Sequence, residues 1–447
     1  MSADADAEYL SDGITESIIN ALSQLPKLRV MARSTVFRYK GKNLAPQDVA
    51  QELNVRAVLT GRVLQRGDTL VIKTELVDGT DGSQLWGEQF NRKMADIFAV
   101  EEEISKEISE KLRLKLSGEQ KQRLTKRHTE NTDAYQEYLK GRYHWNKRTR
   151  EGLLKGIEQF NKAIDIDPHY ALAYAGLADS YNMIASYSSS PPGEAFPKAR
   201  SAAAKALSLD NSLAEAHTSL AFVLLGYDWA FAEAEKEFKV AVALNPGYAT
   251  AHLWYSLFLV TMGRHEEALQ EMEKALALDP LSLPINTNLG WLLYLGRRYD
   301  EALRQLKKTL EMEPNFLLAR RRLCQVYAQK GMYKEAAEEF DKALALSGED
   351  IETIAAQGYF YALSGKQEEA RNVLKELNAM SYHRYVPAYF FAKIFIGLSE
   401  TDNAFDCLHK ALEERYGLLA YMNVEPELEA LRQDARFSEL AQQVGLE

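Results

Sequence analysis

The sequence predicts a mostly α-helical fold, in which an α-α superhelix of stacked helix pairs follows a small α+β domain. Two patterns give this prediction. Alanines recur every 34 residues between positions 234 and 370, and a period of this length is typical of solenoids built from helical hairpins. In the first 118 residues that period is absent, and short runs of alternating apolar and polar residues replace it.

The composition is that of an ordinary folded protein. Of the 447 residues, 46% are hydrophobic and 26% are charged, which excludes a disordered or collagen-like chain. Asp and Glu number 64 against 54 Lys and Arg, so the formal net charge is −10. This acidic balance argues against nucleic acid as the partner. No run of 18 apolar residues is present, so we expect no membrane span in this chain.

Residues 1–118 are predicted to form the α+β domain. A helix is expected over 14–25, because its isoleucines and leucines recur on one face. The short apolar run 28–32 is typical of a strand. A second helix is expected over 46–54, where a proline occupies the first turn.

A three-stranded meander should follow within the same domain. Strands are predicted over 57–65, 69–77 and 84–91, because turns rich in Gly and Asp separate these runs. A long helix with Glu–Lys pairs four residues apart is expected over 97–116. Residues 119–132 are expected to be a linker or an extension of that helix, leading into the repeats.

Residues 133–416 are predicted to form about eight repeat units of two antiparallel helices. The small residues mark close helix approaches, the glycines mark turns, and the prolines end the second helices. The recurring residues are Ala234, Ala268, Ala302, Ala336 and Ala370; Gly263, Gly331 and Gly365; and Pro246, Pro280 and Pro314. This pattern resembles the tetratricopeptide repeat (TPR), whose hairpins stack into a superhelix because each one covers the apolar face of its neighbour.

Residues 417–447 are predicted to form a C-terminal capping segment. Its leucines and valine can supply an apolar side, and a solenoid end needs a cap with a polar outer surface. The stretch 431–437 also resembles the tail that closes many bacterial tetratricopeptide arrays, although Ala435 stands where those usually have Pro.

The amino-terminal domain resembles the TolB amino-terminal-like domain, which is similar to the FlgO and CsgG modules of bacterial envelopes. The stretches 9–16, 28–30, 55–63 and 85–90 carry this resemblance. In those relatives an apolar strand precedes the first helix, and this chain lacks it. We therefore expect an open sheet edge, through which copies of the chain would self-associate. The combination of both parts resembles the carboxy-terminal half of bacterial serine/threonine kinase, winged-helix or cyclase signalling proteins, so the chain is expected to be part of a longer protein.

The sequence contains no recognisable catalytic, cofactor or metal site. Residues 41–42 do not form a phosphate-binding loop, and Leu269 replaces the second histidine of a zinc-protease motif. His217 and His252 occupy equivalent positions of neighbouring units, but two histidines without a third ligand are weak grounds for a metal. We therefore predict that the chain itself is not an enzyme and needs no cofactor.

The concave groove of the repeats is the predicted partner-binding site, because the first helix of each unit lines it in tetratricopeptide arrays. The first helices carry an aromatic and aliphatic stripe with a polar end, and Trp, Tyr and Arg side chains most often dominate the binding energy of interfaces. The alternative, that a tightly wound superhelix buries these residues as core, stays open. The predicted groove residues are Phe222, Leu225, Leu253, Leu257, Val260, Trp291, Tyr294, Arg321, Gln325 and Tyr359.

The leading functional hypothesis is a non-catalytic protein–protein interaction module, the scaffold or sensor half of a bacterial signalling protein, with a protein or peptide in its groove. The first alternative is an envelope-associated assembly factor related to TolB, FlgO or CsgG. The second is the regulatory part of a kinase or cyclase. A chain that stands alone would be cytoplasmic, and one that follows a membrane span would lie on the periplasmic side.

Overall fold

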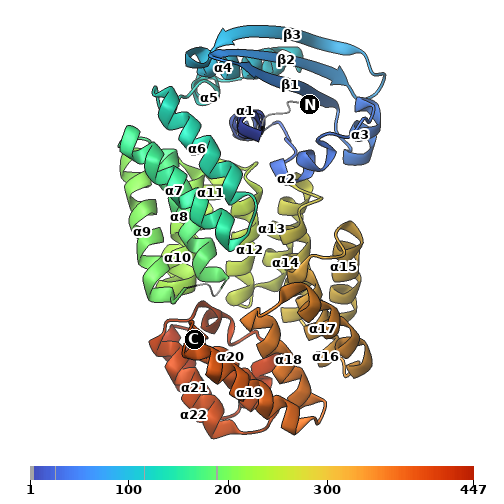
Figure 1. Cartoon of the computed structure of the whole chain (residues 1–447), viewed down its shortest axis with the longest axis vertical. Coiled ribbons are helices and arrows are strands. Elements are labelled where there is room, and N and C mark those ends of the chain that lie inside the picture. Colours follow the sequence, from blue (N-terminus) through green and yellow to red (C-terminus); the bar gives the residue numbers. More distant parts are fainter. Residues whose placement is uncertain (1–4, 26, 115, 188–189, 447) are drawn as a thin grey trace.

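The computed structural model describes residues 5–446 except 26, 115, 188 and 189, and it confirms the predicted fold class. Figure 1 shows the small mixed domain at the top and the helix pairs curving beneath it. Among the described residues, no helix combines the length and the apolar character that crossing a membrane requires.

Within the described residues, the helices α6 to α21 form eight antiparallel pairs. The first helices are α6 Thr132–Trp145, α8 Ala171–Ser186, α10 Ala214–Val223, α12 Ala249–Thr261, α14 Leu283–Leu295, α16 Leu317–Gln329, α18 Ile351–Leu363 and α20 Ala388–Gly397. The second helices are α7 Arg150–Ile166, α9 Pro192–Leu209, α11 Phe231–Leu244, α13 His265–Leu278, α15 Tyr299–Met312, α17 Tyr333–Ser347, α19 Gln367–Ser381 and α21 Thr401–Glu413. The five alanines of the 34-residue series are all fully buried, because only small side chains fit between closely packed helices.

The amino-terminal domain is an antiparallel meander covered on one face by helices. Strands β1 (Ala57–Arg66), β2 (Thr69–Asp78) and β3 (Gln84–Lys93) pair in that order, which confirms the three predicted strands. Among the described residues, β1 and β3 each have one edge without a partner strand. The helical elements of the domain are α1 Ala5–Ser23, α2 Arg33–Val36, η1 Phe37–Tyr39, α3 Pro46–Leu53, η2 Met94–Asp96, α4 Ile97–Lys111 and α5 Gly118–Leu124.

Strand β2 has one buried and one exposed face. Leu70, Ile72 and Leu76 are 0–2% exposed, whereas Lys73 between them is exposed. Because side chains alternate between the faces of a strand, this pattern places α1 and α4 on the apolar face. The outer face is left to water.

The predicted start of the first helix was wrong. Helix α1 begins at Ala5 rather than near residue 14. Asp12 therefore lies inside the helix, where it is buried and its carboxylate pairs with Lys40 (2.6 Å) and Arg33 (3.4 Å). These partners, more than twenty residues along the chain, explain why an acidic residue is buried inside the helix.

Two other predictions for this domain were wrong. Residues 28–32 form no strand, because the segment turns away from the sheet and the Ala32 amide donates to the Leu278 carbonyl of α13 (2.8 Å). The long helix ends at Lys111 instead of residue 116, because Arg113 adopts a left-handed conformation (φ 55°) that no α-helix continues through.

The amino-terminal part of the chain is hydrogen-bonded to the ends of five successive second helices. These bonds, which we call the docking ladder, are Thr129 Oγ1 to Asp167 (2.6 Å), Lys126 Nζ to Asp210 (2.7 Å), Asn245 Nδ2 to Ser23 Oγ (3.2 Å), Thr35 Oγ1 to Asp279 (2.6 Å) and Arg38 Nη1 to the Met312 carbonyl (3.3 Å). Since the ends recur once per repeat, the domain and its linker run along one edge of the superhelix (Figure 1).

The chain ends in two short 3₁₀ helices, η4 (Gly417–Tyr421) and η5 (Pro426–Leu431), followed by α22 (Ala435–Val444). Helix α22 packs on α21, the last repeat helix, and η5 packs on α20. Helix η4 contacts α12 and the π-helical turn η3 (Leu224–Asp228) of the third pair. The segment therefore reaches back from the last repeat to the middle of the array.

Candidate functional site

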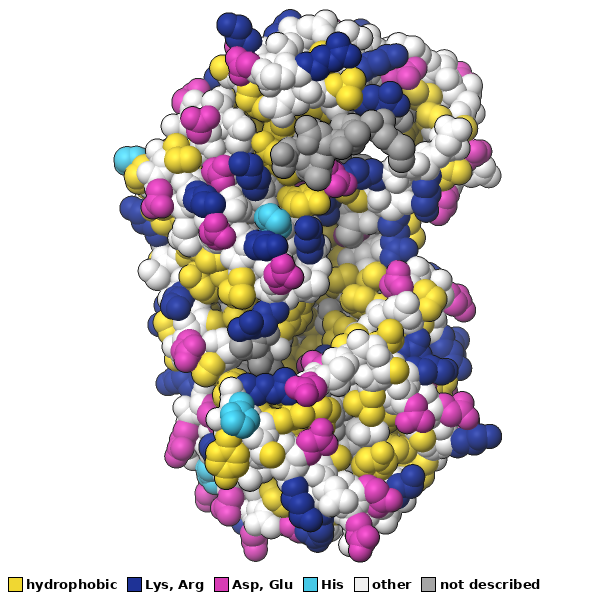
Figure 2. Space-filling model, viewed as in Figure 1, with side chains coloured by type: hydrophobic (Ala, Val, Ile, Leu, Met, Phe, Trp, Pro, Cys, Tyr) yellow, Lys and Arg dark blue, Asp and Glu magenta, His cyan; other side chains and the backbone are white. Residues whose placement is uncertain are grey.

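The predicted groove residues lie on the first helices α10 to α18 and on the turn η3, as the repeat register indicates. Phe222 is half-buried and packs on Trp254, with ring centroids 4.4 Å apart. In Figure 2, hydrophobic side chains gather in a recess at the middle of the molecule, below the amino-terminal domain. The other nine residues are buried, namely Leu225, Leu253, Leu257, Val260, Trp291, Tyr294, Arg321, Gln325 and Tyr359.

The chain's own C-terminal segment covers part of this groove. We call residues 417–431 the C-terminal strap. Tyr421 packs on Trp291 with ring centroids 4.8 Å apart, and Gln325 Nε2 donates to Glu427 Oε1 (3.3 Å). Two of the residues predicted to contact a partner thus contact the strap instead.

The strap is acidic, and it meets cationic side chains of the repeats and their turns. Glu427 forms an ion pair with Lys393 of α20, although burial lowers the pKa of that lysine to about 8. Glu429 pairs with Arg297 (2.7 Å), and Arg297 also donates to the Val424 carbonyl. Sequence reasoning missed Lys393 and Glu427, because no local pattern links residues that only the folded strap brings together.

The three consecutive arginines of α16 are not a solvated face. Arg321 forms ion pairs with Asp350 (3.0 Å) and Glu352 (2.6 Å), and it is 7% exposed. The Arg322 guanidinium lies 4.3 Å from the centre of the Trp291 ring, a favourable cation–π distance. These guanidinium groups are therefore occupied by contacts within the chain.

The two histidines considered as metal ligands belong to a polar clamp repeated along the array. His252 bonds Glu271 of the following helix (2.6 Å) and the Pro246 carbonyl of the preceding turn (3.0 Å). His217 makes the same contacts with Glu237 and the Asn211 carbonyl. In the part of the chain that the structure describes, no three His, Cys, Asp or Glu side chains are placed to hold a metal ion.

A second candidate site is a cavity of about 410 Å³ where the amino-terminal domain meets the repeats. We call it the junction cavity. Helices α1, α4 and α6, the linker 122–129 and the starts of α8 and α10 line it. Its volume falls in the range of small-molecule sites. Sequence reasoning missed it, because its walls come from segments more than a hundred residues apart.

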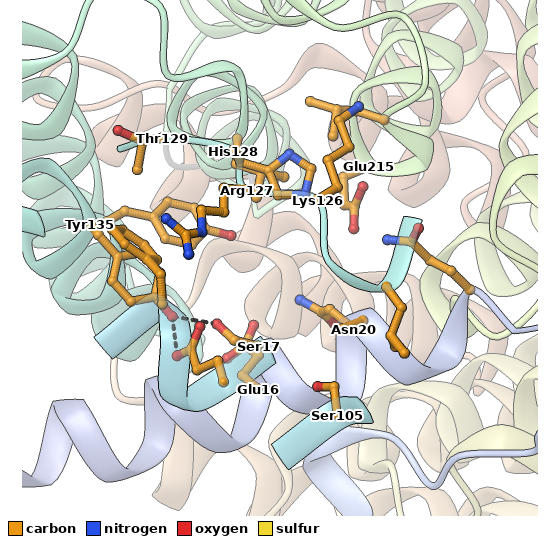
Figure 3. A pocket seen from close by; sticks show the side chains of 18 of the residues that line it. Glu16, Ser17, Asn20, Ser105, Lys126, Arg127, His128, Thr129, Tyr135 and Glu215 are labelled. Atoms are coloured by element: carbon orange, nitrogen blue, oxygen red, sulfur yellow. Dashed lines mark hydrogen bonds between the residues drawn. The ribbon is translucent and has the colours of Figure 1, made fainter. Parts of the chain in front are cut away.

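A hydrogen-bond chain forms one wall of the junction cavity. The Tyr135 hydroxyl donates to Glu101 Oε1 (2.6 Å), and it lies 2.6 Å from the Ser17 hydroxyl (Figure 3). Burial raises the pKa of Glu101 to about 8 and, in the same environment, raises the pKa of Tyr135. At neutral pH this wall is therefore mostly uncharged.

Known protein families match both parts of the chain. Residues 2–107 match the family model described as HilA/YgeH-like transcriptional regulator, second domain. Residues 230–282, 259–315 and 293–357 match models of the tetratricopeptide repeat. The amino-terminal match is to a transcriptional regulator domain, and the resemblance to the TolB domain stays a prediction.

A curated relative from Rhizobium meliloti (strain 1021), named "Putative adenylate cyclase 3", is 33% identical over 226 residues, which are 50% of this chain and 38% of the relative. The alignment thus spans well under half of the relative's length. A structure of the human IFIT1 dimer with m7Gppp-AAAA has a TM-score of 0.50 at 15% identity, covering 79% of this chain and 80% of that one. YrrB, described as a TPR protein with an unusual peptide-binding site, has a TM-score of 0.30 at 24% identity, covering 44% of this chain and 97% of that one.

The family models of the tetratricopeptide repeat and the eight helix pairs agree on the repeat type. The human structure shares the fold alone at its low identity. Tetratricopeptide arrays present extended concave surfaces that bind proteins or peptides. The chain is therefore a mostly helical protein that contains tetratricopeptide repeats, the fold of protein-interaction scaffolds.

Proposed function

We propose that the chain is a non-catalytic interaction module, the scaffold or sensor half of a bacterial signalling protein, which binds a protein or peptide partner on the concave face of its repeats. The observation that carries this proposal is the strap. Its contacts with Trp291 and Gln325 support the proposal, because an irregular acidic segment of the chain already lies on two of the predicted groove residues and one of them, Trp291, is of a type that often dominates interfaces.

The strap indicates the chemistry of the partner. The groove receives an aromatic ring, Tyr421, on Trp291, and it receives carboxylates on Lys393 and Arg297. A partner segment that uses the same groove would combine an aromatic side chain with acidic residues. Phe222 is half-buried at the other end of the predicted site, and it offers that segment an accessible contact.

The comparisons support a regulatory role. One part of the chain matches a domain of a transcriptional regulator, and half of the chain aligns with a protein named as an adenylate cyclase. These names describe two different outputs. A module that occurs in proteins with different activities fits a sensor or scaffold role. Because of the aligned relative, the regulatory part of a cyclase is the second candidate function.

Site-specific photo-crosslinking in the source bacterium tests the proposal. A crosslinker placed at Phe222 should capture one defined protein, whereas a crosslinker at Lys308, exposed on the second helix α15, should not. The variant Phe222→Glu should abolish co-purification of that protein, and the control Lys308→Glu should preserve it. Equal capture at both positions, or no capture at Phe222, would contradict partner binding in the groove.

A further inference from the structure

The junction cavity has aromatic walls and unsatisfied polar groups. Phe98, Tyr135, Tyr138 and Tyr170 line it, and the rings of Phe98 and Tyr135 lie 4.9 Å apart. The rings of Tyr138 and Tyr170 lie 5.2 Å apart. The cavity therefore offers π faces in two pairs, which attract both apolar groups and cations.

Three buried hydroxyl groups that line the cavity have no hydrogen-bond partner among the described residues. Ser105 is 2% exposed, Tyr138 is 8% exposed and Tyr170 is 1% exposed. Because these residues line the cavity, a polar group of a ligand can hydrogen-bond their hydroxyls. In Figure 3, Ser105 on α4 and Asn20 on α1 point into the cavity. These groups are placed to bond a ligand.

Each cationic side chain that lines the cavity already forms an ion pair with a carboxylate. The pairs are Lys126 with Asp210 (2.7 Å), Arg127 with Glu102 (3.4 Å) and Glu130 (3.1 Å), and Arg142 with Glu16 (2.6 Å) and Asp179 (3.7 Å). His128 also approaches Asp210, at 3.7 Å.

Two carboxyl groups that line the cavity remain without a cation among the described residues. Glu101 is bonded only by the Tyr135 hydroxyl, and Glu215, in the first turn of α10, has no ion pair or side-chain hydrogen bond. Glu215 approaches the cavity from the side opposite Asn20 and Ser105 (Figure 3). Glu101 is mostly protonated at neutral pH, because burial raises its pKa to about 8, so Glu215 is the charged group that lacks a cation.

We propose that the junction cavity binds a small organic cation, an amine with an apolar body. Its ammonium group would pair with Glu215, while its apolar body would lie against the tyrosine and phenylalanine rings. The unsatisfied hydroxyls of Ser105, Tyr138 and Tyr170 would accept hydrogen bonds from the ammonium group or from polar substituents.

Binding there would couple the two parts of the chain. The cavity has walls from the amino-terminal domain (α1 and α4) and from the repeats (α6, α8 and α10). A ligand that contacts both favours the docked arrangement by its differential affinity for it. The site is separate from the groove and does not rest on the proposed function, so the two can fail independently.

Isothermal titration of the full chain with 2-phenylethylamine, and with its neutral analogue 2-phenylethanol, tests the proposal. We expect the amine to bind and the alcohol to bind at least about tenfold more weakly, because only the amine carries a positive charge that can pair with Glu215. Tryptamine and spermidine extend the series to a larger and to a more highly charged amine.

Variants assign the binding to this cavity. Glu215→Gln keeps the side-chain shape and should weaken amine binding at least about tenfold, whereas Glu311→Gln, an exposed carboxylate on α15, should leave it unchanged. Equal affinities for amine and alcohol would overturn the proposal without any variant. An unchanged affinity in Glu215→Gln, or no saturable binding of the three amines at millimolar concentration, would overturn it as well.

Discussion

At the scale of single residues, a few buried carboxyl and ammonium groups should make the stability of this fold depend on pH. Glu101 is the clearest case, because burial raises its pKa to about 8 from 4.5. Between these two values the unfolded chain loses a proton that the folded chain keeps. The free energy of unfolding should therefore fall as the pH rises through this range.

The variant Glu101→Gln tests this dependence, because an amide does not titrate. Urea unfolding at about pH 5 and about pH 8 should give a smaller loss of stability in the variant than in the wild-type chain. Glu311→Gln is the matched control and should retain the wild-type loss. Equal losses in Glu101→Gln and the wild type would mean that this carboxyl ionises normally in the folded state.

The ion pair of Lys393 and Glu427 gives a second prediction at this scale. Both side chains are buried, at 8% and 2% exposure. Glu427→Gln would leave the ammonium group without its carboxylate, and breaking a buried pair in this way costs about 3–5 kcal/mol. The double variant Lys393→Met with Glu427→Leu should recover most of that loss in urea unfolding. Losses that simply add in the double variant would show that the two groups do not act as a pair.

At the scale of the elements, the polar clamp fixes four first helices, α10, α12, α14 and α16, to the turns before them and to their own second helices. The same register position holds His217, His252, Asn286 and Arg320, and each donates to the carbonyl six residues earlier. Four different side chains thus perform one task. This contact has the repeat period although its residues do not look alike in the sequence.

Removing one clamp should destabilise the array measurably. His252→Ala would leave the Pro246 carbonyl without its donor and Glu271 with Lys274 alone, at a cost of about 1–3 kcal/mol. His169→Ala, at an exposed position, is the control and should change the melting temperature little. A His252→Ala chain as stable as the control would mean that water replaces the clamp.

A glycine sandwich sets the spacing of the first two pairs. A Cβ at Gly141 would lie 2.5 Å from the Phe160 ring, and a Cβ at Gly176 would lie 2.6 Å from the same ring. Phe160 is fully buried between them. Gly141→Ala should therefore cost about 1–3 kcal/mol by overpacking, as judged by thermal unfolding. Gly118→Ala, where the structure leaves open space, should be neutral or slightly stabilising.

The 34-residue period and the alternation of apolar and polar residues predicted most of the helices and strands. They could not predict which of these elements contact each other. The 34-residue series gave the repeat type, and alternation gave the three strands. The predicted groove residues could be assigned to the first helices because every repeat has the same order of helices. The strap contacts on Trp291 and Gln325 join residues about a hundred positions apart, and the docking ladder joins residues up to 274 positions apart. Such contacts depend on the superhelical curvature, which single repeats do not encode.

For the whole molecule, the docking ladder predicts that the amino-terminal domain and the repeats unfold together. Asp279 accepts from both Ser34 and Thr35 and is 6% exposed. Asp279→Ala should loosen the domain, because the buried Thr35 hydroxyl and the exposed Ser34 hydroxyl lose their acceptor. Hydrogen exchange should rise in 28–36 and in the linker 118–131. Asp300→Ala, at an exposed ion pair, should leave both segments protected, and equal protection in Asp279→Ala would mean that apolar contacts hold the domain alone.

The docking ladder also has a mechanical meaning. A helical solenoid is a spring, because each repeat contacts only its neighbours and small rotations add up along its length. In this protein the hydrogen bonds of the docking ladder stiffen one edge of the solenoid, from Asp167 to Met312. The braced repeats should therefore resist stretching as a single block. The repeats after α15 lie outside the ladder, so beyond α15 the strap, which contacts α12, Gln325 of α16 and α20, would resist a pull on the two ends of the chain.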